Sequence, residues 1–124
     1  MNKQILLIDD DEDEQNIFNQ ALDKAQIACK CICASSAKKG IELLNTLSPD
    51  YIFLDINMPG MNGLECLMEI KKQKSLKPIP VIMYSTGVND ELTYAAIKLG
   101  AAACIKKEYS IEDLADTLRQ ILFC

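Results

Sequence analysis

Several side chains that can bind metal ions or phosphate follow directly after short apolar runs. They are Asp9 and Asp10 after 5–8, Asp55 after 51–54, Ser85 and Thr86 after 81–84, and Lys106 and Lys107 after 101–105. Carboxylates brought together repel unless a cation lies among them, and a hard divalent ion such as Mg²⁺ suits a cluster of oxygen ligands. A carboxylate can also attack a phosphoryl group and form an acyl phosphate. These residue types therefore indicate Mg²⁺-dependent phosphoryl transfer.

Asp55 is the strongest candidate for the reacting group. The loop that follows it, NMPGMNG at 57–63, contains proline and glycines that fix a turn and let the backbone approach a ligand closely. Phosphoryl transfer depends mainly on positioning and electrostatics. We therefore expect Lys107 and Ser85 to hold the oxygens of the transferred group.

Alternating strands and helices would bring these side chains together. Apolar runs rich in β-forming residues occur at 5–8, 29–34, 51–54, 81–84 and 101–105, and segments of helical period lie between them. Nearly continuous apolar strands separated by helices are typical of a parallel sheet covered on both faces. Ligands of such α/β sheets bind beyond the carboxyl ends of the strands, where the candidate residues stand.

Six consecutive acids, 9–14, account for the acidity of the chain. The net charge is −5, from 18 acids and 13 bases, so without this run 12 acids face 13 bases. Asp11, Glu12, Asp13 and Glu14 are predicted to cap and open the first helix, where negative charge meets the positive end of the helix dipole. The two acids of the site could instead be Asp10 and Asp11, one residue further along the chain. We assign the pair to the two acids that directly follow the apolar run.

The composition excludes several classes of function. The chain contains no histidine, so a Ser-His-Asp or Cys-His triad, a His-ligated zinc site and a phosphohistidine carrier cannot be built from it alone. No basic surface is expected that would bind DNA, and no apolar run approaches the about 18 residues of a membrane span. We expect one cytoplasmic domain over 1–124, without an output domain.

Six cysteines are expected to be mostly buried thiols rather than a disulfide framework. Cys29, Cys31 and Cys33 alternate, so they would share one face of a strand. The alternative interpretation is that these thiols bind a metal ion. Alternating thiols without a CxxC pair are, however, poorly placed to provide tetrahedral coordination.

Four motifs, in order, resemble the receiver domain of two-component response regulators over essentially the whole chain. They are ILLIDD at 5–10, FLDINMPGMNG at 53–63, VIMYST at 81–86, and GA at 100–101 followed by Lys107. The resemblance implies a flavodoxin-like, CheY-like three-layer α/β sandwich. Its parallel sheet has five strands in the order 2-1-3-4-5, with five helices.

The resemblance also implies a role for each site residue. Asp55 would accept a phosphoryl group from a phosphohistidine on a sensor histidine kinase or phosphotransfer protein, Ser85 would hydrogen-bond that group, and Lys107 would pair with it. The implied Mg²⁺ ligands are the side chains of Asp9, Asp10 and Asp55 and the backbone carbonyl of Asn57, with Asp9 acting directly or through water. The chain would be a signalling module rather than an enzyme. Phosphorylation would bias a surface of the fourth helix, fifth strand and fifth helix that a downstream protein reads.

Two positions depart from the family pattern. Cys104 stands where relatives carry an aromatic residue in the fifth strand, and Glu108 follows Lys107 where they carry proline. A cis bond without proline costs about 3 kcal/mol more than a trans bond. We expect the phosphorylation chemistry to survive both changes and the switching mechanism to differ, with Tyr84 or Tyr109 as substitute moving aromatics.

Two other classes compete with a receiver. A phosphatase of the haloacid dehalogenase kind also uses an aspartate nucleophile and Mg²⁺, but it needs a second acid two residues later, where this chain has Asn57. A small-molecule binding module of the flavodoxin kind needs a phosphate-cradling loop after the first strand. The acids at that place would repel phosphate.

Overall fold

Five parallel strands alternate with five helices along the part of the chain that the structure, a computed structural model, describes, residues 3–107 and 110–122. The elements in chain order are β1 (Lys3–Ile8), α1 (Glu12–Lys24), β2 (Cys29–Ala34), α2 (Ala37–Leu43), β3 (Tyr51–Asp55), α3 (Gly63–Lys72), β4 (Val81–Ser85), α4 (Asp90–Lys98), β5 (Ala103–Lys106) and α5 (Ile111–Leu122).

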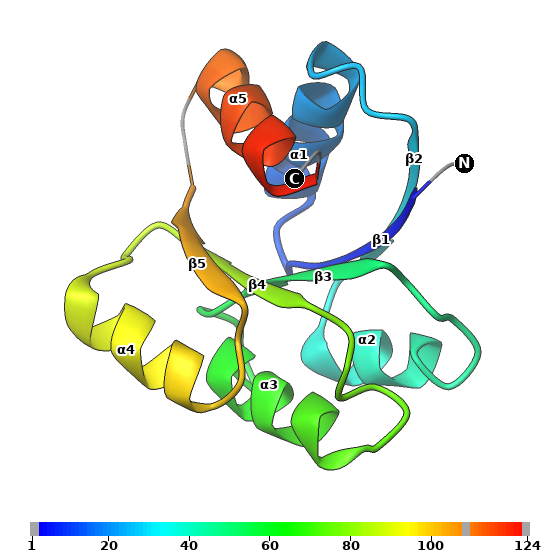
Figure 1. Ribbon diagram of the computed structural model, residues 1–124, viewed down its shortest axis with the longest axis vertical. Helices are drawn as coiled ribbons and strands as arrows, with labels where there is room; N and C mark the ends of the chain where they lie inside the picture. The colour runs from blue at the N-terminus through cyan, green and yellow to red at the C-terminus, as the bar shows by residue number, and fades with distance from the viewer. Residues whose placement is uncertain (1–2, 108–109, 123–124) are drawn as a thin grey trace.

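The strands form one sheet in the order β2-β1-β3-β4-β5, which confirms the predicted fold. Helices α1 and α5 cover one face, and α2, α3 and α4 cover the other, so the molecule has three layers (Figure 1). In the centre of the sheet Ile8 of β1 pairs with Leu54 of β3. The residues that follow each of them, Asp9 and Asp55, therefore reach the same edge.

Strand β1 shows how the apolar runs build the two cores. Its last four residues are completely buried. Ile5 and Leu7 face the core under α1 and α5, whereas Leu6 and Ile8 face the core under α2, α3 and α4. Successive side chains of a strand point to opposite faces, so a strand covered on both sides must be apolar throughout.

The acid run divides between the sheet edge and the first helix. Asp11 is the N-cap of α1, and its carboxylate accepts hydrogen bonds from the backbone N–H groups of Asp13 at 2.9 Å and Glu14 at 3.4 Å. Glu12, Asp13 and Glu14 form the first turn. This confirms their predicted capping role and removes Asp11 from the acid pair.

The fifth strand begins two residues later than predicted. Gly100 has a φ of 110° and ends the α4 segment, and the backbone N–H of Ala101 donates to the carbonyl of Ala96 at 3.0 Å. Ala101 therefore closes the helix, and β5 begins at Ala103.

Two positions singled out from the sequence, 108 and 109, lie outside the described residues. Within those that are described, no helix is both long and apolar enough to cross a membrane.

Candidate functional site

Three carboxylates meet at the carboxyl edge of the central strands. Asp9 and Asp10 follow β1 and Asp55 ends β3, and each offers an oxygen within 4.8 Å of the others. Asp9 is completely buried, Asp55 is 4% exposed, and Asp10 is exposed. The cluster therefore has a buried floor and one side open to solvent.

Lys107 supplies positive charge from the loop after β5. Its Nζ donates to Asp9 Oδ2 at 2.9 Å and lies 3.5 Å from Asp55 Oδ2 and 4.0 Å from Glu14 Oε2. The side chain is only 8% exposed. The Tyr84 ring centroid lies 5.2 Å from the same nitrogen. Lys107 thus neutralises part of the acid cluster from the side of α1.

The pKa values report how the charges balance. Burial raises the pKa of Asp55 from 3.8 to about 6, and the negative charge of Asp9 adds to this, while Lys107 opposes it. Burial lowers the pKa of Lys107, but its hydrogen bond with Asp9 and the charges of Asp9 and Asp55 outweigh burial and raise it overall. Lys107 stays protonated, and one cation leaves the carboxylates incompletely compensated.

Backbone geometry holds Asp55 beside Ser85. Asp55 Oδ1 accepts a hydrogen bond from the backbone N–H of Asn57 at 3.3 Å. The Asn57 amide donates to Ser85 Oγ at 3.4 Å, and the backbone N–H of Gly87 donates to the same oxygen at 3.4 Å. The Ser85 hydroxyl is buried at the end of β4. It therefore stands at the same edge as the carboxylates.

Gly63 lets the start of α3 approach this loop. Its backbone N–H donates to the carbonyl of Ile56 at 2.9 Å. A Cβ at this position would meet the carbonyl oxygen of Asp55 and lie 2.6 Å from the Cα of Ile56. Only a residue without a side chain fits here, so Gly63 is part of what places Asp55.

The structure brings together every predicted site residue: the side chains of Asp9, Asp10, Asp55, Ser85 and Lys107, with Asn57 beside them. Two neighbours were not predicted. Glu14 was assigned only to the first turn of α1, and no local pattern shows that its carboxylate lies 4.0 Å from Lys107 Nζ. Tyr84 was assigned to β4, and no local pattern shows that its ring lies under Lys107.

The position that departs from the family pattern lies on the other face of the sheet from Tyr84. Cys104 is half-buried against the core under α2, α3 and α4. Tyr84 is completely buried against α1 and α5, edge-on to Phe18 with ring centroids 5.7 Å apart. Tyr84 and Cys104 therefore contact different cores, on opposite faces of the sheet.

The donor set fits a hard divalent cation. Three carboxylates with one lysine leave net negative charge, and oxygen ligands open to solvent on one side suit an ion that retains water. Negative charge would at the same time repel a phosphoryl group in the absence of the ion. The site can therefore hold a divalent metal and, with it, a phosphoryl group beside Asp55.

Comparisons with known proteins agree with this geometry. The sequence matches the family described as response regulator receiver domain over residues 5–119. It is 39% identical over 116 residues to the nitrate/nitrite response regulator protein NarL of Escherichia coli (strain K12), covering 94% of this chain and 53% of that protein. The chain thus spans about half the length of this curated relative.

Solved structures show the same fold. The Mn²⁺-bound form of the response regulator Rcp1 has a TM-score of 0.81 at 28% identity, covering 96% of this chain and 91% of that one. The phosphorylated cyanobacterial phytochrome response regulator RcpA has a TM-score of 0.85 at 26% identity, covering 98% and 91%.

Proposed function

Because the chain belongs to the response regulator receiver domain family, we propose that it is a phosphoacceptor module of a two-component system. Asp55 accepts the phosphoryl group from a phosphohistidine on a sensor histidine kinase or phosphotransfer protein. The observation that carries this role is the buried Asp55 carboxylate, 3.5 Å from Lys107 and clustered with two further carboxylates. Residues 1–124 then act as one cytoplasmic receiver, a signalling protein rather than an enzyme.

In this reaction an oxygen of Asp55 forms the new bond to phosphorus while the bond from phosphorus to the donor imidazole breaks. The imidazole leaves with the bonding electrons and takes up a proton. Lys107 pairs with an oxygen of the transferred group, and the Ser85 hydroxyl donates a hydrogen bond to another. Both side chains are already held at this edge by contacts within the protein.

Mg²⁺ is the proposed cofactor, held by the side chains of Asp9, Asp10 and Asp55 and by the backbone carbonyl of Asn57. When bound, it neutralises charge on the carboxylates and on the phosphoryl oxygens. The clustered carboxylates support this assignment, as does a relative that was solved with Mn²⁺ bound. Asp9, which Lys107 already holds at 2.9 Å, acts directly or through water.

The surface formed by α4, β5 and α5 is the proposed output surface for a downstream protein. Tyr94 and Ile97 of α4 are 64% and 45% exposed, and Lys98 Nζ lies 5.3 Å from the Tyr94 ring centroid. Aromatic residues are enriched at protein interfaces. Since the chain has Cys104 in place of the usual aromatic residue, the change that phosphorylation makes here differs from the pattern of its relatives.

The mass of the intact protein after incubation with Mg²⁺ and acetyl phosphate tests the acceptor. We expect one phosphoryl group on the wild type, none after chelation of Mg²⁺, and none on Asp55→Asn. Asp23→Asn, which removes an exposed carboxylate of α1, serves as the matched control and should be phosphorylated like the wild type. An adduct that persists in Asp55→Asn, or no adduct on the wild type, would refute the assignment.

A phosphomonoester assay separates this role from a phosphatase. The haloacid dehalogenase alternative has no support among the relatives described above, and Asn57 stands where that mechanism needs an acid. We expect no turnover of p-nitrophenyl phosphate beyond the level of Asp55→Asn. Sustained, Asp55-dependent release of nitrophenol would identify an enzyme instead.

A further inference from the structure

Lys107 has an acidic neighbour besides Asp9 and Asp55. Glu14 of α1 places its Oε2 4.0 Å from Lys107 Nζ. Among the described residues, the acids close enough to one another to bind a single ion are Asp9, Asp10 and Asp55, and Glu14 is not one of them. Glu14 therefore acts on the lysine from outside the candidate metal site.

The way α1 begins holds Glu14 beside Lys107. The side-chain amide of Gln15 donates to the backbone carbonyl of Asp9 at 2.8 Å, and the backbone N–H of Asp11 donates to Asp9 Oδ1 at 2.9 Å. These bonds join the first turn of α1 to the end of β1. Lys107 is bound to the same residue, because its Nζ donates to Asp9 Oδ2 at 2.9 Å. Both partners of the Glu14–Lys107 pair are thus tied to Asp9.

Glu14 supplies charge to Lys107 rather than a hydrogen bond. The separation of 4.0 Å exceeds the about 2.7–3.2 Å of an N–H···O hydrogen bond. Asp9 already orients the lysine through a hydrogen bond of 2.9 Å, so Lys107 should keep its place without Glu14. The negative charge of Glu14 nevertheless offsets part of the positive charge that Lys107 can offer to another anion.

In the reaction proposed for Asp55, that other anion is the phosphoryl group. Lys107 Nζ lies 3.5 Å from Asp55 Oδ2, so a group transferred to Asp55 brings its negative oxygens close to the lysine. Glu14 faces the same ammonium group. The side chain of Lys107 is 8% exposed and that of Glu14 is 28% exposed, so solvent and salt screen this pair less than a pair on the open surface. The carboxylate and the phosphoryl oxygens therefore compete for one cation.

We propose that Glu14 restrains phosphorylation by competing with the phosphoryl group for Lys107. This inference rests on the function proposed for Asp55. Glu14 is not a catalytic residue, because it acts through Lys107 and no bond to it forms or breaks. Without its charge, Lys107 pairs more strongly with the oxygens of the transferred group, and Asp55 is phosphorylated faster.

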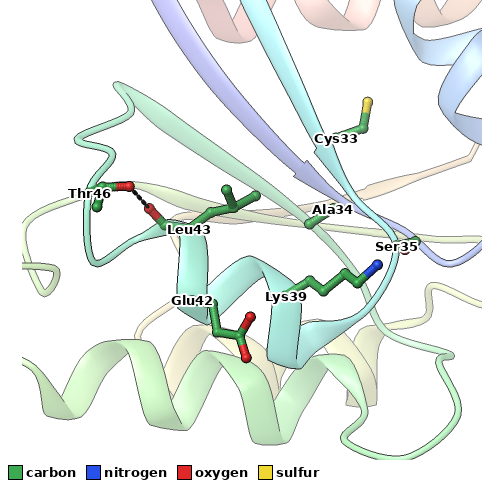
Figure 2. A pocket seen from close by; sticks show the side chains of 7 residues that line it. All are labelled: Cys33, Ala34, Ser35, Lys39, Glu42, Leu43 and Thr46. Atoms are coloured by element: carbon green, nitrogen blue, oxygen red, sulfur yellow. Dashed lines mark hydrogen bonds between the residues drawn. The ribbon is translucent and has the colours of Figure 1, made fainter.

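Two other acids offer matched controls. Glu12 is exposed in the same first turn of α1, and within the described chain its carboxylate makes no ion pair with Lys107. Glu42 belongs to α2, on the other face of the sheet, where it borders a cavity of about 380 Å³ together with Lys39 (Figure 2). Replacing either acid by glutamine removes the same charge from the chain. These variants therefore measure how net charge alone affects the reaction with an anionic phosphoryl donor.

The rate of phosphorylation by acetyl phosphate and Mg²⁺, followed by intact mass, tests the competition. At low ionic strength we expect Glu14→Gln to react about two- to fivefold faster than Glu12→Gln and Glu42→Gln, as suits a partly exposed ion pair. In about 1 M salt, where the Debye length is about 3 Å, the gap should close, whereas an effect of Glu14 on the packing of α1 would persist. Glu14→Asp keeps the charge and should stay close to the wild type. Equal rates in the three glutamine variants, or a gap that salt does not reduce, would overturn the proposal.

The wild type separates this proposal from the function on which it rests. No adduct on the wild type would refute phosphorylation of Asp55, and the role of Glu14 with it. An adduct on the wild type without a gap between the variants would refute the role of Glu14 alone. On the background of Lys107→Gln, the change Glu14→Gln should no longer raise the rate. A rise of the same size there would show that Glu14 repels the donor directly and would overturn competition for the lysine.

Discussion

Replacing Asp55 by asparagine should stabilise the metal-free protein at neutral pH. The side chain of Asp55 is 6% exposed and lies near the buried Asp9, and Lys107 Nζ is closer to Asp9, at 2.9 Å, than to Asp55, at 3.5 Å. The ionised Asp55 carboxylate is therefore desolvated and repelled more than it is compensated. An amide of the same shape removes that charge and keeps an oxygen that can accept from Asn57.

The size of the effect follows from the pKa. Burial and the charge of Asp9 raise the pKa of Asp55 from its ordinary 3.8 to about 6 in the folded protein. A carboxyl whose folded pKa is raised destabilises the fold when ionised. That cost is fully present above pH 6 and is absent below pH 3.8. At 1.36 kcal/mol per pH unit it corresponds to roughly 3 kcal/mol at pH 7.5.

Urea unfolding with a metal chelator present measures this difference. We expect Asp55→Asn to exceed the wild type by about 2–3 kcal/mol at pH 7.5, and the gap to shrink steadily as the pH falls from 6 towards 4. Asp23→Asn, at an exposed position, should change stability by less than about 0.5 kcal/mol at either pH. Added Mg²⁺ should narrow the gap by stabilising the wild type. A destabilised Asp55→Asn, or a gap independent of pH, would refute the electrostatic account of the site.

Four further experiments should have distinct outcomes. Gly63→Ala should destabilise the protein by more than about 2 kcal/mol in urea unfolding, because the added Cβ lies 2.6 Å from the Cα of Ile56 and the backbone must shift; a neutral result would contradict this packing. Ser36→Ala removes the N-cap of α2 and should cost about 1 kcal/mol in the same assay, whereas an unchanged midpoint would show that the cap contributes nothing. With a pKa of about 6, Cys33 should be alkylated half-maximally near pH 6 and faster above it. Cys66, buried with a pKa of about 12, should resist iodoacetamide at pH 8 in the native state, and rapid native labelling would show that α3 opens.

Local sequence was enough to predict the alternation of strands and helices. It also predicted which acids of the run 9–14 follow the first strand and which cap and open the first helix. The apolar runs are continuous because a strand covered on both faces has no solvent side. Asp11 caps α1 through the backbone N–H of Asp13, a contact between residues two apart. Such interactions depend on neighbours in the chain, so spacing alone predicts them. The four motifs and their order indicated the receiver domain family, and the comparisons confirmed it.

Contacts between distant residues needed the tertiary structure. Lys107 and Asp9 are 98 residues apart and meet because β1 and the end of β5 reach one edge. The ring of Tyr84 lies beneath Lys107, and Glu14 faces it from α1, because of how the helix packs on the sheet. The side chains that meet at this edge were thus predicted from the sequence. Their burial, and with it the raised pKa of Asp55, arose only when the layers closed over them, because desolvation depends on everything packed around a charge.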